Sequence, residues 1–289
     1  MAALRTLVDG HDTAHLPTDD RGLLYGDGLF ETCVLRAGRL ELWSRHLQRL
    51  SQGCQRLNIP EPDTQQLAAE LRRLCNGVGD GLVKLIVTRG SGGRGYRPPS
   101  PASPRRIWQL FALPEYPPDY ARRGVCLHRC QTRLGHNPLL AGIKHLNRLE
   151  QVLARSEWDD PNRPEGLLQD SAGNVIEATM SNLFVLSEGR LLTPDLRRCG
   201  VAGVMRAELM ELAGDAGIEV HSSDINRQQL DHADELFLSN SVMRIWPVRA
   251  VGQQRYQVGD LTRRLSRLLA DRLARSGHVV DGLANGGND

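Results

Sequence analysis

Four short apolar runs in the second half of the chain constrain its fold more than any other feature. They cover residues 165–169, 175–178, 183–186 and 191–192, and turn-forming residues separate them. Strands this short and this closely spaced are typical of a sheet that curls into a barrel. Helical patterns follow near 203–216 and 260–275, with further strands at 234–239 and 245–251. The second half is therefore expected to be a barrel-like domain.

The first half predicts a smaller domain of mixed strands and helices. Ser44 can cap a helix that runs to about Leu57, and Asp63 can cap a second helix that directs leucines inward. Strands are predicted at 82–88 and 107–113, and a loop rich in Gly, Pro, Ser and Arg joins them. A loop of that length inside a compact domain is usually functional or mobile.

A cluster of prolines at 114, 117 and 118 indicates the boundary between the two halves. We therefore expect an α+β protein with two domains. They are a small α/β amino-terminal domain (1–116) and a larger barrel-like carboxy-terminal domain (124–280), joined by a linker (117–123). The glycine-rich segment 281–289 is expected to be a disordered tail.

Charge and cysteine usage exclude several classes of function. The net charge of +2 over 289 residues gives no reason to expect nucleic-acid binding. No apolar stretch is long enough to cross a membrane, and the acidic amino terminus does not read as a signal peptide. The six cysteines form no Cys-x-x-Cys pair, so no metal site is expected and a reducing cytoplasm fits best.

Lys144 is the residue most suggestive of chemistry. It follows a turn at Gly142 and precedes apolar residues at helical spacing (Leu146, Leu149, Val152 and Leu153). Apolar neighbours and a nearby helix amino terminus favour the neutral amine, which a Schiff-base lysine or a lysine general base requires. The alternative is a solvated lysine at a helix start, and spacing alone does not decide between them.

The glycine-rich segment 90–95 follows a strand and suggests a phosphate-binding loop. It lacks the Gly-Lys-Ser/Thr ending, and four prolines after it prevent a helix from opening there. Without a helix amino terminus the anion site of such a loop is missing. A nucleotide-binding loop is therefore not favoured.

Six segments in register resemble the fold-type IV pyridoxal-phosphate enzymes, the branched-chain/D-amino-acid aminotransferase superfamily. The chain looks most like the lyase branch of that superfamily, and the likeness spans roughly residues 5–252. The segments that carry it are 20–32, 45–50, 89–96, 137–151, 177–184 and 200–206.

The resemblance implies a pyridoxal 5'-phosphate enzyme in which Lys144 holds the cofactor and acts as the catalytic base. It also implies that Glu177 pairs with the pyridine nitrogen of the cofactor and that Arg45 binds its phosphate. A glutamate at a strand end facing water is the alternative for Glu177. Arg45 lies at a predicted helix start, where structure alone would favour an acid.

Further cofactor contacts are expected around a predicted helix that opens at Gly203. There the backbone amides of Val204 and Met205 can point at an anion. The resemblance adds Asn182, Asn240 and Ser241, although ordinary turn chemistry would explain the last two equally well.

The loop residues Arg94, Tyr96 and Arg97, together with Phe30, are expected to bind substrate. Arginines suit a substrate that carries carboxylates, and Arg21 is a further candidate. A solvated, flexible loop remains the alternative reading.

The reaction implied is conversion of 4-amino-4-deoxychorismate to 4-aminobenzoate and pyruvate in folate biosynthesis, by a cytoplasmic homodimer that borrows site residues from its partner. The cofactor is expected in the cleft between the two domains. One alternative is an aminotransferase acting on branched-chain or D-amino acids. The other is a non-catalytic binding protein, which would lack the visible absorbance of a bound pyridoxal group.

Overall fold

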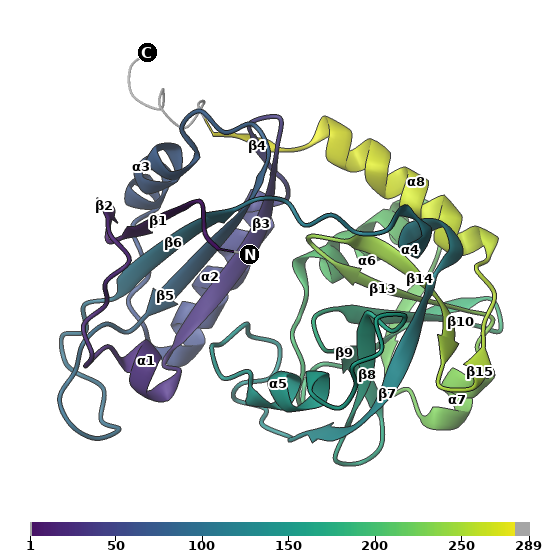
Figure 1. The fold of residues 1–289 in the computed structure, drawn as a ribbon. Coiled ribbons are helices and arrows are strands. Elements are labelled where there is room, and N and C mark those ends of the chain that lie inside the picture. The colour runs from purple at the N-terminus through teal and green to yellow at the C-terminus, as the bar shows by residue number, and fades with distance from the viewer. Residues whose placement is uncertain (1, 281–289) are drawn as a thin grey trace. The chain divides into compact units, whose positions relative to one another are not determined.

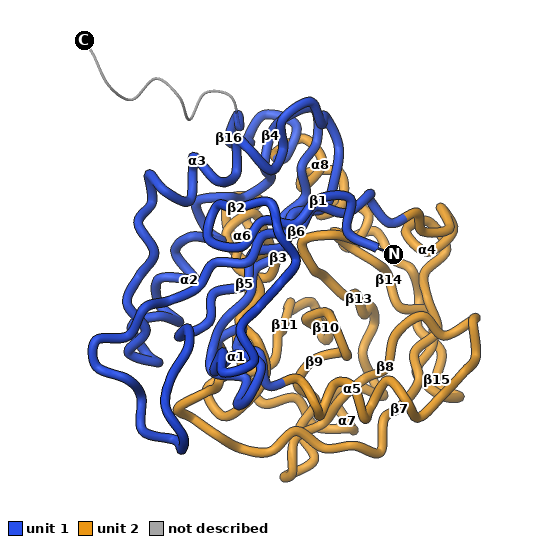
Figure 2. The backbone as a smooth tube through the Cα atoms, turned by 60° about the vertical axis from the view of Figure 1, so that its left-hand side comes forward, with its two compact units in different colours: residues 1–114, 143–147, 273–289 blue, residues 115–142, 148–272 orange. Residues whose placement is uncertain are grey.

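The computed structural model describes residues 2–280, and the chain divides into two compact units (Figure 2). Among the described residues, unit 1 contains 2–114, 143–147 and 273–280, and unit 2 contains 115–142 and 148–272. The boundary between unit 1 and unit 2 after Pro114 lies within the proline cluster noted in the sequence. The return of 143–147 and 273–280 to unit 1 differs from the single boundary drawn from the sequence, and the predicted tail lies outside the described residues.

Unit 1 is built on an antiparallel sheet of seven strands, in the order β16-β4-β3-β5-β6-β1-β2 (Figure 1). Its strands are β1 (Arg5–Val8), β2 (His11–Asp12), β3 (Gly28–Arg36), β4 (Arg39–Leu40), β5 (Gly81–Thr88), β6 (Arg105–Phe111) and β16 (His278–Val279). Its helices are α1 (Arg21–Tyr25), α2 (Trp43–Leu57) and α3 (Thr64–Cys75).

One face of this sheet is covered by α2 and α3. Glu31, Leu85 and Trp108 lie side by side in the register of β3, β5 and β6. Glu31 is hydrogen-bonded to His46 of α2, and Trp108 donates its indole N–H to Glu70 of α3 at 2.8 Å. Both helices therefore pack on the same row of side chains, while the alternate residues of β3, including Phe30, point to the opposite face.

The predicted helices of unit 1 are confirmed, but one cap is wrong. Asp63 accepts a hydrogen bond from the backbone N–H of Gln66 and caps α3 as expected. Ser44 is exposed within α2, whose N-cap is Leu42 in the left-handed conformation (φ 53°). The helix starts earlier than the capping rule suggested because Trp43 packs into the core beside Trp108.

Unit 2 contains a barrel of six strands, which confirms the α+β class with a barrel-like second part. The order β10-β13-β14-β7-β8-β9 closes because β9 also pairs with β10, through Glu177 opposite Asn182. The barrel strands are β7 (Val125–Leu134), β8 (Glu165–Asp170), β9 (Val175–Ala178), β10 (Asn182–Ser187), β13 (Glu235–Asn240) and β14 (Arg244–Val251). Beside them lie β11 (Arg190–Pro194), β12 (Val220–Ser223) and β15 (Gln254–Arg255).

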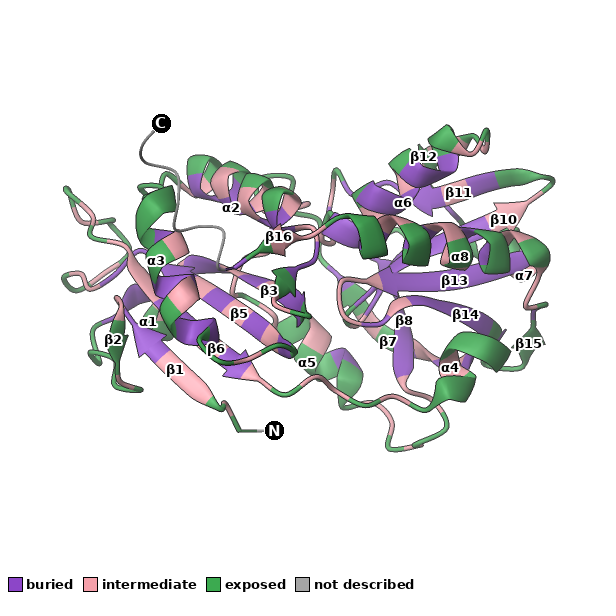
Figure 3. Ribbon diagram, turned by 90° about the horizontal axis from the view of Figure 1, so that it is seen from above, coloured by how far each residue is buried: buried purple, intermediate pink, exposed green. Residues whose placement is uncertain are grey.

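The helices of unit 2 differ from expectation at one functionally relevant place. They are α4 (Pro118–Arg123, within the predicted linker), α5 (Leu149–Arg155), α6 (Val204–Asp215), α7 (Arg227–Asp231) and α8 (Asp260–Arg275), whose last residues belong to unit 1. The helix after Lys144 begins only at Leu149, although the helical spacing of apolar residues begins at Leu146. Its apolar residues Leu149, Val152 and Leu153 are 75, 57 and 62% exposed, so this face of α5 does not pack into the core of the described chain (Figure 3). Within residues 2–280, no helix combines the length and apolar character needed to cross a membrane.

Candidate active site

Lys144 belongs to a short extended segment that pairs with the start of β3 within unit 1. The backbone N–H of Phe30 donates to the carbonyl of Lys144, and the N–H of Leu146 donates to the carbonyl of Gly28, both at 3.0 Å. Gly142, with φ 82°, provides the turn that precedes the segment. Lys144 is thus fixed by strand pairing, and the expected nearby helix start lies five positions further on, at Leu149. The helix contribution to a neutral Lys144 amine is therefore not supported.

The side chain of Lys144 packs against an aromatic ring. Its Nζ lies 4.3 Å from the ring centroid of Phe30, and the Nζ of Lys84 lies 5.5 Å from the same centroid. Lys144 is half-buried, so its amine has an apolar surface on one side. Burial lowers the pKa of Lys84. Phe30, a predicted substrate contact, therefore lies next to both lysines of the sequence.

A buried charged cluster lies behind β3 and was not predicted. Glu31 accepts from Nε and Nη2 of Arg49 at 2.8 and 2.5 Å, and it lies 2.6 Å from Nδ1 of His46. Burial alone would raise the pKa of Glu31, but the charge and hydrogen bonds of Arg49 outweigh it and lower that pKa to about 2. Burial lowers the pKa of His46, and this effect outweighs the hydrogen bond and charge of Glu31, which would raise that pKa.

Arg45, the predicted phosphate ligand, is half-buried in the first turn of α2, where acidic residues are lacking. It lies one turn before Arg49 on the same helix. The motif 45–50 therefore contains two arginines near the start of α2, and the sequence analysis selected only the first.

The predicted substrate loop between β5 and β6 is anchored by Arg21. Nη1 and Nη2 of Arg21 donate to the carbonyls of Gly95 and Tyr96, both at 3.0 Å, and its Nε donates to Asp27. Arg21 is 4% exposed, so it supports the loop and is not a freely available carboxylate ligand. Arg94, Tyr96 and Arg97 are exposed, Tyr96 at 85%.

Glu177 lies in unit 2, at the bridge that closes the barrel. Its side chain is buried and accepts a hydrogen bond from the backbone N–H of Val201 at 2.9 Å. Asn182, its partner across the strands, donates to the carbonyl of Val201 at 2.8 Å. The reading of Glu177 as a carboxylate facing water is therefore wrong, because barrel closure removes it from solvent.

The segment 200–203 approaches these side chains closely because it contains glycines. A Cβ on Gly203 would lie 2.0 Å from Oδ1 of Asn182, and one on Gly200 would lie 3.3 Å from Oε2 of Glu177. α6 begins immediately afterwards at Val204, and its N-cap, Gly203, has no side chain with which to cap the first N–H groups. This helix start is therefore suited to bind an anion.

The turn after β13 holds the remaining predicted cofactor residues. Asn240 accepts from the backbone N–H groups of Val242 and Met243 at 2.9 and 2.8 Å, and it donates to the carbonyl of Met180 at 3.1 Å. The side chain of Asn240 therefore orders two loops, while Ser241 is half-buried in the turn itself.

A second unpredicted acid supports the loop that follows Glu177. Glu165 accepts from the hydroxyl groups of Thr179 and Ser181 and from the backbone N–H of Met180. Burial raises the pKa of Glu165, and these hydrogen bonds oppose that rise. No local pattern identified Glu165, because it lies in an apolar run that reads as a plain strand.

The structure thus groups the predicted residues within each unit. In unit 1, strand pairing brings Lys144 to Phe30 near the Glu31, His46 and Arg49 cluster. In unit 2, barrel closure brings Glu177, Asn182 and the start of α6 together. The sequence analysis missed Glu31, His46, Arg49 and Glu165, although the first three lie within segments that carried the resemblance.

Comparison with known proteins identifies the family of the chain. The family model "Amino-transferase class IV" matches residues 28–251. A 4-amino-4-deoxychorismate lyase structure from Pseudomonas aeruginosa is 54% identical, with a TM-score of 0.90, over 93% of this chain and 99% of that one. An aminodeoxychorismate lyase from Vibrio harveyi is 37% identical over 89% of this chain and 97% of its own. A putative branched-chain-amino-acid aminotransferase from Methanocaldococcus jannaschii is 32% identical over 91% and 93%.

Proposed function

We propose, from the premise that the chain belongs to the amino-transferase class IV family, that it is a pyridoxal-phosphate lyase. Its reaction is conversion of 4-amino-4-deoxychorismate to 4-aminobenzoate and pyruvate, a step of folate biosynthesis. The observation that carries this proposal is the full-length similarity to two lyases together with the seating of Lys144 on Phe30.

The donor set of the described residues fits pyridoxal 5'-phosphate. Lys144 offers an amine for the aldehyde, buried Glu177 offers a carboxylate for the pyridine nitrogen, and the amides of Val204 and Met205 suit the phosphate. Asn182, Asn240 and Ser241 are proposed as further contacts, and an arginine of α2 as the phosphate cation. When bound, the cofactor supplies an electron sink for the carbanion that forms at the substrate carbon bearing the amine.

Lys144 then transfers one proton of the substrate, and Glu177 keeps a second proton on the pyridine nitrogen. Nζ of Lys144 takes the proton from the carbon that bears the substrate amine and returns it to the methylene carbon of the departing enolpyruvyl group, which becomes pyruvate. The Phe30 ring restricts where Nζ can lie, which orients it for both transfers. The carboxylate of Glu177 favours a proton on the pyridine nitrogen. Loss of the enolpyruvyl group makes the substrate ring aromatic, and this provides the driving force.

The substrate carries two carboxylates, and the 91–104 loop offers cations for them. Arg94 and Arg97 are exposed, and the hydrogen bonds of Arg21 to Gly95 and Tyr96 fix the backbone between them. Arginine binds carboxylates through paired N–H groups, so this loop is the proposed substrate contact, together with Phe30 and Tyr96.

A homodimer is part of the proposal, and the exposed apolar face of α5 supports it. Leu149, Val152 and Leu153 form this face, and Leu139, earlier in the chain, is 80% exposed. Contiguous exposed apolar side chains on a helix mark a surface that another protein covers. A cytoplasmic location is also proposed, because all six cysteines are free thiols, as a reducing compartment would keep them.

A direct assay separates this function from transamination, the activity named for the Methanocaldococcus jannaschii relative. Purified protein is given 4-amino-4-deoxychorismate, and 4-aminobenzoate is followed by its fluorescence. A second reaction contains a branched-chain or D-amino acid with a 2-oxo acid. Formation of 4-aminobenzoate that is lost in Lys144→Ala and retained in Lys84→Arg supports the lyase. Amino-group transfer without 4-aminobenzoate would establish the aminotransferase instead.

A further inference from the structure

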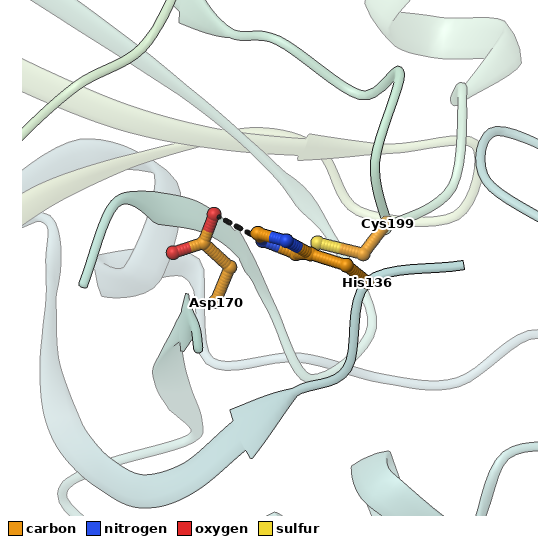
Figure 4. A group of neighbouring side chains, drawn as sticks. All are labelled: His136, Asp170 and Cys199. Carbon is orange, nitrogen blue, oxygen red and sulfur yellow. Dashed lines mark hydrogen bonds and ion pairs between the residues drawn. The ribbon is translucent and has the colours of Figure 1, made fainter. Parts of the chain in front are cut away.

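Three side chains of unit 2 form a cluster that the proposed lyase chemistry does not use. His136 follows β7, Asp170 ends β8, and Cys199 lies between β11 and α6 (Figure 4). Each offers one ligand atom, and these atoms all lie within 4.8 Å of one another. The three residues are far apart in the sequence, so only the tertiary structure brings them together.

The three ligand atoms lie close enough together for small movements to bring them to the separations of a zinc site. Nε2 of His136 and Oδ2 of Asp170 are 2.9 Å apart, joined by the dashed line in Figure 4. Ligand atoms of tetrahedral zinc lie about 3.3 to 3.6 Å apart, given bond lengths of about 2.0 Å to nitrogen or oxygen and 2.3 Å to sulfur. A small separation of the imidazole from the carboxylate and a rotation of the Cys199 thiol would therefore accommodate the ion.

The chemistry of the three donors selects the kind of metal. Thiolate sulfur is a soft ligand and imidazole nitrogen a borderline one, and this combination favours Zn²⁺ or Co²⁺ over Mg²⁺ or Ca²⁺. Three protein ligands leave a fourth tetrahedral position for a water molecule. His136 is about one-third exposed, so this position can open toward solvent.

Hydrogen bonds hold the cluster in place from outside. Oδ1 of Asp170 accepts from the backbone N–H groups of Ala172 and Asn174 at 3.0 and 2.8 Å, which fixes the carboxylate at 0% exposure. The loop of His136 is joined to that of Cys199, since the N–H of Asn137 donates to the carbonyl of Arg198 at 2.8 Å. Such outer contacts orient ligands and strengthen metal binding.

Charged side chains of both signs surround the Cys199 thiol. It interacts electrostatically with the carboxylates of Asp170, Glu177 and Glu150 and with the guanidinium of Arg198. Arg148 in turn interacts with Glu177 and Glu150. Arg198 lies 4.0 Å from Oδ2 of Asp170 but is also paired with Asp224, which draws its charge away from the cluster.

We propose that His136, Asp170 and Cys199 bind a zinc ion, with water as the fourth ligand. On binding, the S–H bond of Cys199 breaks, a zinc–sulfur bond forms and the proton passes to solvent, with no change of oxidation state. The site is distinct from the proposed cofactor contacts, although Cys199 lies two positions before Val201, the residue that donates to Glu177.

Equilibrium dialysis of the full chain against Zn²⁺ alone tests the site, with bound metal measured by atomic absorption. We expect one zinc per chain in the wild type and in the matched variants Cys126→Ser and His128→Gln. Affinity should fall at least about tenfold in Cys199→Ser and in His136→Gln. With Co²⁺ as the probe, tetrahedral visible bands should appear in the wild type and be lost in both ligand variants.

Two results would overturn the proposal. One is no zinc bound above the free concentration, and the other is equal binding by the wild type, Cys199→Ser and His136→Gln. His136 lies in a partly exposed loop, so His136→Gln should fold even if a change at the buried Cys199 does not. Circular dichroism of each variant confirms that the comparison is between folded proteins. Neither readout depends on lyase activity.

Discussion

Replacing Glu31 by glutamine should remove a pH-dependent part of the protein's stability. Glu31 is 2% exposed and is held by Arg49 and His46. Its pKa falls from the ordinary 4.5 to about 2 in the folded chain. A pKa shift of this size corresponds to about 3 kcal/mol of unfolding free energy, because each unit of pKa shift is equivalent to about 1.4 kcal/mol. Breaking a buried ion pair by removing one partner gives a similar cost, about 3–5 kcal/mol.

The lowered pKa of Glu31 determines whether stability rises or falls with pH. Because the folded-state pKa is the lower one, the stabilisation is fully present above pH 4.5 and is lost as the pH falls toward 2. The pKa of His46 is also lowered, so the cost of protonating this buried imidazole begins to reduce stability as the pH falls below its ordinary value of 6.5. The wild type should therefore lose stability over two acid ranges, and Glu31→Gln should lack the lower one.

Urea unfolding of wild type and Glu31→Gln at several pH values between neutrality and about pH 3 measures this difference. The variant should be about 3 kcal/mol less stable at neutral pH. The gap should shrink below pH 4.5, where Glu31 takes up a proton in the unfolded wild type but stays ionised in the folded protein. Glu61→Gln is the control, because Glu61 is exposed and its removal should change stability little at any pH. A gap of constant size from neutral to acid pH would refute the reasoning, since it would mean that the Glu31 charge does not contribute.

Three further predictions concern the proposed cofactor. Borohydride reduction and peptide mapping should place the pyridoxyl group on Lys144, because Lys144 is the lysine in the family's segment and packs on Phe30; a label on Lys84, the only other lysine of the sequence, would contradict this. Arg45→Ala should lose cofactor on dialysis, measured by absorbance, while Arg49→Ala is compared in parallel; loss only in Arg49→Ala would identify the other arginine of α2 as the phosphate ligand. Glu177→Gln should lower turnover strongly with a modest change in KM, because the charge is removed while volume and hydrogen-bonding reach remain; near-wild-type turnover in the folded, cofactor-loaded variant would exclude the proposed role.

The periodicity of the sequence determined most elements of the fold. The short strands at 165–192 lie within strands of the barrel or beside it, and the helices at 64–75, 204–215 and 260–275 were anticipated closely. Apolar spacing and local caps fix the helices because helical hydrogen bonds are formed between neighbours in the chain, while the strands are recognised as short apolar runs between turn residues. The sequence also supplied the segments that contain Lys144, Glu177 and Arg45.

Local sequence patterns do not predict burial that depends on residues far away in the chain. α5 has the apolar spacing of a core helix, yet that face is exposed within the described chain. Ser44 has the character of a cap, but Trp43 starts α2 before it. In each case the local pattern is present in the sequence, but tertiary packing determines which residues are buried and where the helix begins.

Only the tertiary structure decided which side chains share a site. Closure of the barrel through Glu177 and Asn182 buries a carboxylate that local rules would leave in water. Strand pairing with β3, rather than a helix start, positions Lys144 beside Phe30. The Glu31 cluster and the His136, Asp170 and Cys199 group join residues from separate elements. These clusters are stabilised by electrostatic interactions and hydrogen bonds between residues that are far apart in the sequence. The periodicity of the sequence does not predict such interactions.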